Sequence, residues 1–220
     1  MRARDYVKDH TPRFYERLSA LAHRGYYSRG TAMLNAVFIH IPKTGGTSIR
    51  SLVPGSGKGH ATALEYRRAN PRKFERVFKF SFVRNPWDRV ASAYWFLEQG
   101  GDPDVNDTDK HCEADERAFA FGSTTSLNQF VEERLHLCMN QPHFQPQHGF
   151  ICDAGMNLMD FTGQYEALDA DFEIVRRRLG IKGALPRLNR SRQAVKTDWS
   201  RQAHETIGTL YETDISIFGY

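Results

Sequence analysis

A lysine, two glycines and several hydroxyl residues follow a short apolar run in the stretch "FIHIPKTGGTSI", residues 38–49. Glycine leaves no side chain between the backbone and a ligand, and the first amides of a helix that starts there have no partner inside the helix. The positive end of the helix dipole also attracts an anion. The stretch predicts a phosphate site rather than an ordinary strand-to-helix turn, built from Lys43, Thr44, Gly45, Gly46, Thr47 and Ser48.

The position of the lysine separates this turn from the P-loop of nucleoside triphosphatases, where the lysine follows the glycines in G-x-x-x-x-G-K-[ST]. The later "GSGKG" does not supply that motif, because Gly59 replaces its hydroxyl residue and Leu52 its first glycine. Lys43 is therefore expected close to where a 5′-phosphate joins its leaving group. A P-loop kinase-like phosphotransferase is the alternative function.

A second turn of similar design lies in "FSFVRNPWDRVASAYWF", residues 80–96. Asn85 is a good N-cap, so Arg84 stands at the end of a strand beside a helix N-terminus, with Ser92 two turns into that helix. The planar guanidinium of Arg84 suits a phosphate, although an ion pair with Asp88 is the alternative. Two anion sites on one sheet indicate a ligand phosphorylated at two separate positions.

Arg89, which lies between Arg84 and Ser92 in the sequence, is expected to face solvent or to pair with Glu98.

Apolar strands that alternate with helices predict an α/β fold with a central parallel sheet flanked by helices, in which ligands bind at the carboxyl ends of the strands. The acidic segment 100–116 is expected to be a loop, and the proline-broken segment 140–151 to be irregular. The expected strands are 36–41, 76–83 and 159–166, and the expected helices are about 12–24, 46–52, 61–69, 86–97, 125–138, 169–179 and 198–218.

The bulk properties of the chain suit a single domain over residues 1–220, with 1–34 as an N-terminal helical extension. No apolar window reaches membrane-spanning length, and three widely spaced cysteines favour a reducing compartment over disulfides or zinc. We therefore expect a cytoplasmic protein with no stable membrane insertion and no metal. A net charge of +4 suits an anionic ligand but is too small to indicate nucleic acid.

"HIPKTGGTSI", followed by "FVRNPWDRVASAY", closely resembles the paired signatures of the sulfotransferase family, whose members use 3′-phosphoadenosine 5′-phosphosulfate (PAPS). The likeness is nearest to the carbohydrate branch, which includes heparan sulfate 2-O- and chondroitin sulfotransferases and many bacterial proteins. It covers most of the chain from about residue 37 to the end. It implies a P-loop-like three-layer fold and a soluble, bacterial-type enzyme.

The resemblance also implies roles for individual residues. The first turn would hold the 5′-phosphosulfate, with Lys43 on the 5′-phosphate and the bridging oxygen, and Arg84 and Ser92 would hold the 3′-phosphate. Arg190 and Arg192 lie in a segment that resembles the lid over the nucleotide. The product would be 3′-phosphoadenosine 5′-phosphate (PAP), and no metal is required.

One group must take the proton from the acceptor hydroxyl, and an imidazole near its usual pKa suits that task. His60 is the first candidate, because relatives of the heparan sulfate 2-O- type place a catalytic histidine there. His143 is the second candidate and otherwise shapes the acceptor site with His148, and Glu65 is a weaker one.

The acceptor is expected to be a carbohydrate or another small hydroxylated molecule, since the acidic segment disfavours a polyanion. A nucleotide-binding module without turnover is a further alternative, and the sequence leaves the oligomeric state open.

Overall fold

The computed structural model describes residues 25–55, 57–101, 107–186 and 197–220. The helix predicted at 12–24 lies outside these residues. None of the helices within them has both the length and the apolar character that crossing a membrane requires.

The central sheet consists of three parallel strands in the order β1 (Ala36–Ile39), β2 (Phe78–Val83) and β5 (Phe161–Gln164). Side chains alternate between its two faces, as the pleat requires. Phe38 and Phe80 belong to the core that contains residues of α4 (Gly46–Leu52) and α11 (Leu168–Leu179). Val37, Ile39 and Val83 belong to the core that contains residues of α5 (Ala63–Ala69) and α6 (Pro71–Arg76). This arrangement confirms the predicted α/β fold with a parallel sheet between helices.

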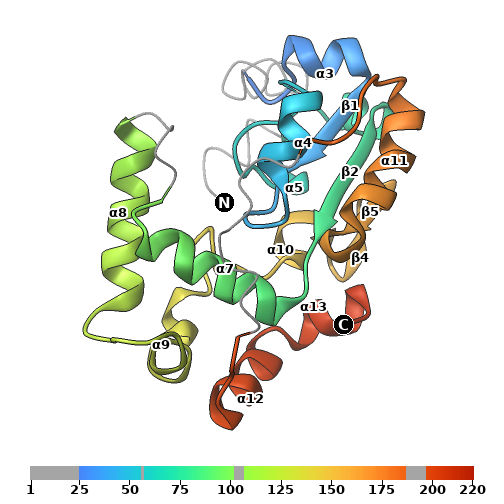
Figure 1. The fold of residues 1–220 in the computed structure, drawn as a ribbon. Coiled ribbons are helices and arrows are strands. Elements are labelled where there is room, and N and C mark those ends of the chain that lie inside the picture. The colour runs from blue at the N-terminus through green and yellow to red at the C-terminus, as the bar shows by residue number, and fades with distance from the viewer. Residues whose placement is uncertain (1–24, 56, 102–106, 187–196) are drawn as a thin grey trace, which may run out of the picture.

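The remaining elements follow the chain around this sheet (Figure 1). They are α3 (Arg29–Leu34), α5 (Ala63–Ala69), α6 (Pro71–Arg76), α7 (Pro86–Glu98), α8 (Asp107–Phe121), α9 (Leu127–Glu133), a 3-10 turn (Leu135–Cys138), α10 (His148–Ile151), the antiparallel pair β3 (Cys152–Asp153) and β4 (Met156–Asn157), a second 3-10 turn (Tyr165–Ala167), α12 (Arg201–Leu210) and α13 (Glu212–Phe218).

The prediction of an acidic loop over 100–116 is wrong, because α8 begins at Asp107 and runs through most of it. The helix has a buried side: Glu116 and Ala120 are buried, whereas Asp115 and Arg117 are exposed. Acidic composition had suggested a solvated loop, but helical spacing of the buried positions decides the structure.

Several other boundaries differ from prediction: β1 ends at Ile39, α5 begins at Ala63, β5 spans only Phe161–Gln164, and α10 lies inside the segment expected to be irregular. The strand expected from residue 76 begins at Phe78, because α6 extends to Arg76. Asn70 caps that helix, and Pro71 occupies its first position. The expected C-terminal helix is divided at Tyr211 into α12 and α13. The helix expected over 125–138 ends at Glu133, and a 3-10 turn continues it.

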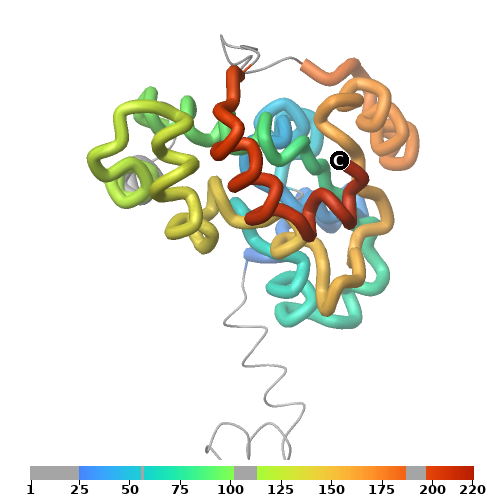
Figure 2. Tube along the Cα trace, turned by 90° about the horizontal axis from the view of Figure 1, so that it is seen from below, coloured from blue at the N-terminus to red at the C-terminus, as the bar shows by residue number. Residues whose placement is uncertain are grey.

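A third core lies away from the sheet, among α7, α8, α9 and α12. Its buried residues include Tyr94, Phe130, Phe144 and Ile207. Figure 1 shows α8 and α9 set apart from the sheet, with α7 running between the two regions. Seen from below, α12 and α13 lie between α8 on one side and α11 on the other (Figure 2). The ends of β1 and β2 thus meet a helical lobe with its own packing.

Candidate active site

The first predicted turn connects β1 to α4 in a tightly constrained way. Lys43 has a left-handed backbone with φ of 69°, and Gly45, the N-cap of α4, has φ of 83°. The hydroxyl of Thr44 is buried and donates to the carbonyl of Ile41 at 2.9 Å. A Cβ atom on Gly46 would lie 1.8 Å from Nε2 of His40, so any other residue here would displace that ring or α4. Of the remaining predicted ligands, Ser48 is buried and Thr47 is exposed on α4.

Two arginines of the second turn hold the backbone of Lys43 from both sides. Nε of Arg89 donates to the carbonyl of Pro42 at 3.0 Å, and Nη1 of Arg84 donates to the carbonyl of Lys43 at 3.2 Å. The ammonium of Lys43 lies 3.7 Å from the ring centroid of Phe96 on α7. The two turns predicted to bind separate phosphates are therefore joined directly.

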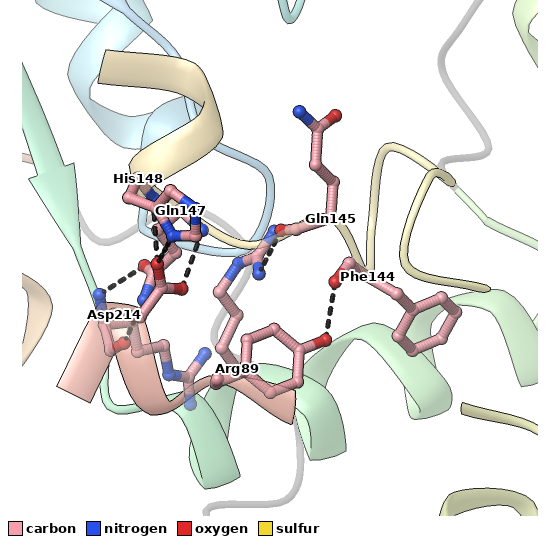
Figure 3. Close-up of polar contacts among 8 residues, drawn as sticks. Arg89, Phe144, Gln145, Gln147, His148 and Asp214 are labelled. Carbon is pink, nitrogen blue, oxygen red and sulfur yellow. Dashed lines mark hydrogen bonds and ion pairs between the residues drawn. The ribbon is translucent and has the colours of Figure 1, made fainter. Parts of the chain in front are cut away.

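Arg89 contradicts the expectation that it faces solvent or pairs with Glu98. The residue is 1% exposed, and its Nη1 donates to the carbonyl of Gln145 at 2.9 Å. Nη2 is buried with no hydrogen-bond partner among the described residues. Burial lowers the pKa of Arg89 from its ordinary value. Figure 3 shows this side chain reaching the loop that precedes Gln147 and His148.

Arg84 is held at its backbone and at its side chain. Its N–H donates to Oε1 of Gln147 and its carbonyl accepts from Nε2 of the same residue, both at 2.8 Å. Its guanidinium carbon lies 4.3 Å from the ring centroid of Tyr165, and its buried Nε atom has no hydrogen-bond partner within the part of the chain that the structure describes. Ser92, its predicted companion, lies half-buried on α7.

Asp214, on α13, supports this arrangement although sequence analysis did not single it out. Its carboxylate is fully buried and accepts hydrogen bonds from the backbone of Gln147 at 2.7 Å and of His148 at 2.9 Å. It also contacts Nδ1 of His148 at 2.7 Å (Figure 3). Asp214 thereby fixes the residue that pairs with the backbone of Arg84. A lone aspartate in an amphipathic helix gives no sequence signal for such a role.

Three histidines from distant parts of the chain form a row beside Lys43. The ring centroids of His40 and His60 lie 4.7 Å apart, and those of His60 and His143 lie 6.1 Å apart. His143 also contacts Phe96, the ring beneath the Lys43 ammonium, at 5.0 Å between centroids. The candidates Lys43, His60 and His143 are therefore gathered in one site.

Carboxyl and carbonyl groups orient two of these rings. Nδ1 of His60 lies 3.2 Å from the carbonyl oxygen of His40, and Nδ1 of His143 lies 2.7 Å from a carboxylate oxygen of Glu116. The other carboxylate oxygen of Glu116 accepts from the backbone N–H of His143 at 3.0 Å. Glu116 escaped sequence analysis because the segment around it was expected to be a solvated loop.

The pKa of His60 departs from the usual value that was expected of it. Although the residue is exposed, the surrounding protein desolvates its ring and lowers the pKa to about 4. The neighbouring His143 and Arg50 act in the same direction, against a hydrogen bond to His40 and the charge of Glu116. His60 is therefore neutral at pH 7.

Glu65, the weaker candidate base, takes part in the capping box of α5. One carboxylate oxygen accepts from the backbone of Thr62 at 2.7 Å, and the other accepts from the hydroxyl of Tyr26 at 3.0 Å. Among the described residues, no cluster of three or more metal-ligating side chains could hold a metal ion. Arg190 and Arg192 lie outside the described residues.

A family model for the sulfotransferase family matches residues 33–220, and the chain belongs to that family. The match confirms the resemblance found in the two motifs and identifies an enzyme class that transfers sulfuryl groups. A search of curated proteins found no match.

Proposed function

We propose that the protein transfers the sulfuryl group of PAPS to a hydroxyl of a carbohydrate or another small hydroxylated molecule and releases PAP. One observation carries this proposal: the 3.2 Å hydrogen bond from Arg84 to the carbonyl of Lys43. It brings the two cationic turns together where β1 and β2 end, which suits a ligand charged at two positions.

The residues present fit such a donor. The guanidinium of Arg84 is stacked on Tyr165, and its buried Nε has no partner among the residues that the structure describes, which suits an anion. We assign the 3′-phosphate to Arg84 and Ser92 and the 5′-phosphate to Lys43 and its turn. Bound PAPS supplies a sulfuryl group attached to a good leaving group.

Lys43 would neutralise the charge that grows on the leaving phosphate, so that no metal is required. His60 would take the proton of the acceptor during in-line displacement. A backbone carbonyl only accepts hydrogen bonds, so Nδ1 of His60 carries the proton that binds the carbonyl of His40. Nε2 is then the basic nitrogen of the neutral ring.

The first experiment is thermal unfolding of the full chain with PAP, in the presence and absence of Mg²⁺, and with Mg·ATP. We expect PAP alone to raise Tm, because a ligand at 100 times its Kd stabilises by about 2.7 kcal/mol. A double variant, Lys43→Met with Arg84→Gln, should lose this shift. Stabilisation by Mg·ATP but not by PAP would favour the kinase-like alternative.

The second experiment measures transfer of label from [³⁵S]PAPS to a panel of mono- and oligosaccharides. The variant His60→Ala should bind PAP normally and lose transfer. Exposed His136→Ala is the control for loss of a histidine, and exposed Arg201→Gln is the control for the charges lost in the double variant of the first experiment. A wild-type protein that binds PAP but never turns PAPS over would be a binding module, contrary to the proposal.

A further inference from the structure

The Glu116 carboxylate is an unusual group to find in a helix-packing position. It is 6% exposed, on the inner side of α8, and both its oxygens are directed to the backbone and ring of His143. Burying a carboxylate is unfavourable unless it is hydrogen-bonded or paired. If this position only packed α8 against the lobe, an apolar side chain would be sufficient. The buried carboxylate therefore indicates that Glu116 acts on His143.

The contacts determine which nitrogen of each ring carries a proton. An ionised carboxylate only accepts hydrogen bonds, so Nδ1 of His143 is protonated, as is Nδ1 of His60 against its carbonyl. In the neutral rings, Nε2 is then the basic nitrogen of both. A proton on His143 lies directly beside the Glu116 carboxylate, whereas one on His60 has a carbonyl as its direct partner and feels the charge of Glu116 only from farther away.

The two rings lie edge to face with centroids 6.1 Å apart, too far for a direct hydrogen bond between them but within the reach of one bridging water molecule. Phe96 links His143 to Lys43, so the pair borders the predicted leaving-group site. The low pKa of His60, about 4, means that a proton taken up there is readily given up.

We propose that His143, oriented by Glu116, is a second proton-handling residue that receives the acceptor's proton from His60. This inference rests on the proposed function. As the acceptor oxygen bonds to sulfur, the bond from sulfur to the 5′-phosphate breaks and its electron pair stays on that phosphate. The acceptor O–H proton passes to Nε2 of His60, then through one water molecule to Nε2 of His143, and leaves to solvent after product release. Glu116 is a positioning residue that acts through His143.

The first test needs no acceptor. Long-range ¹H–¹⁵N correlation spectra of the ¹⁵N-histidine-labelled full chain with PAP identify the protonated nitrogen of each ring, with assignment by His60→Gln and His143→Gln. We expect the proton of neutral His143 on Nδ1 in the wild type, and a mixture of both tautomers in Glu116→Gln. A wild-type His143 protonated on Nε2 would overturn the proposal.

The second test is a double-mutant cycle on PAP release from PAPS, with water as acceptor or with an acceptor from the saccharide panel. Made alone, Glu116→Gln should slow turnover about 10- to 100-fold. Added to His60→Gln, it should slow turnover less than threefold, because Glu116 acts on a proton that His60 delivers. PAP affinity should stay within threefold in all variants. Exposed Asp115→Asn on the same helix is the matched control.

Equal losses in both backgrounds would show that Glu116 only supports the fold. A mild effect of His60→Gln beside a severe effect of His143→Gln would make His143 the direct base and overturn the proposed order. If the wild type releases no PAP, the proposed function fails, whereas the spectra still decide the arrangement at His143.

Discussion

The Nε atom of Arg89 lies 3.0 Å from the carbonyl oxygen of Pro42, the residue directly before Lys43. With Arg84 on the next carbonyl, this bond fixes both peptide groups that flank the α-carbon of Lys43. A left-handed conformation costs a residue with a side chain about 1–2 kcal/mol. The second motif therefore maintains the conformation of the first, besides any contact it makes with a ligand.

Replacing Arg89 by lysine should keep the charge but lose at least one of its two carbonyl bonds. We expect the free energy of unfolding in urea to fall by about 1–3 kcal/mol and PAP affinity, measured by calorimetry, to fall several-fold, because Lys43 is no longer held.

Arg134→Lys is the matched control, because Arg134 also donates to two carbonyls, those of Phe119 and Ala120, but in the helical lobe. It should lose stability without losing PAP affinity. Unchanged PAP affinity in Arg89→Lys would contradict the role assigned to Arg89.

The variant Gly46→Ala should be destabilised and should bind PAP poorly. Its methyl group would lie 1.8 Å from Nε2 of His40, so either α4 or the histidine must move. Gly208→Ala in the interior of α12 is the opposite case, since its nearest neighbour, Trp87, lies 3.6 Å away. That change should stabilise by about 0.5–1 kcal/mol. Equal effects of both changes in urea denaturation would argue against a closely packed turn.

Stability should fall as the pH is lowered from about 6.5 towards 4, partly because of His60. The pKa of His60 is about 4 in the folded protein and 6.5 ordinarily, so between these values the unfolded chain binds more protons. His40, whose pKa burial also lowers, acts in the same direction.

Denaturation midpoints at pH 7, 6 and 5 should therefore decline less steeply in His60→Gln than in the wild type. Exposed His136→Gln should follow the wild type. Identical slopes for His60→Gln and wild type would mean that His60 titrates alike in both states.

Asp214→Asn should weaken both folding and PAP binding. An asparagine cannot accept all three hydrogen bonds that reach Asp214, and a buried group left unpaired costs about 1–3 kcal/mol. Gln147 would then hold the backbone of Arg84 less firmly. Asp160→Asn is the control, because Asp160 accepts from the backbone of Lys79 near the other end of β2. PAP binding should decline only in the first variant, as titration calorimetry would reveal.

Local signals in the sequence predicted the sheet and the two cationic turns well. The bounds of α4 match residue for residue, and Gly180 ends α11 with φ of 65° as expected of a C-cap glycine. These features depend on residues that are neighbours in the chain. The family match agrees with the same two motifs.

The partners of the site residues could not be predicted, because they come from far along the chain. Glu116 and His143 are 27 residues apart, and Asp214 lies 67 residues from Gln147. Arg89 looked like a surface residue because its partners are backbone carbonyls, which carry no mark in the sequence. Pairings of this kind arise only when the helical lobe packs onto the end of the sheet.

The division of the interior into separate cores has a consequence for how such an enzyme diversifies. The turn that carries Lys43 is built on the core around the sheet, whereas Glu116 is carried by α8, which packs into the helical lobe. We expect substitutions on α8 and α9 to change which hydroxyl compounds are accepted, whereas α7, which carries Arg89 and Ser92, should tolerate few changes without loss of nucleotide binding. Descendants that keep the sheet, its two turns and α7 would thus diverge in the molecules that they modify.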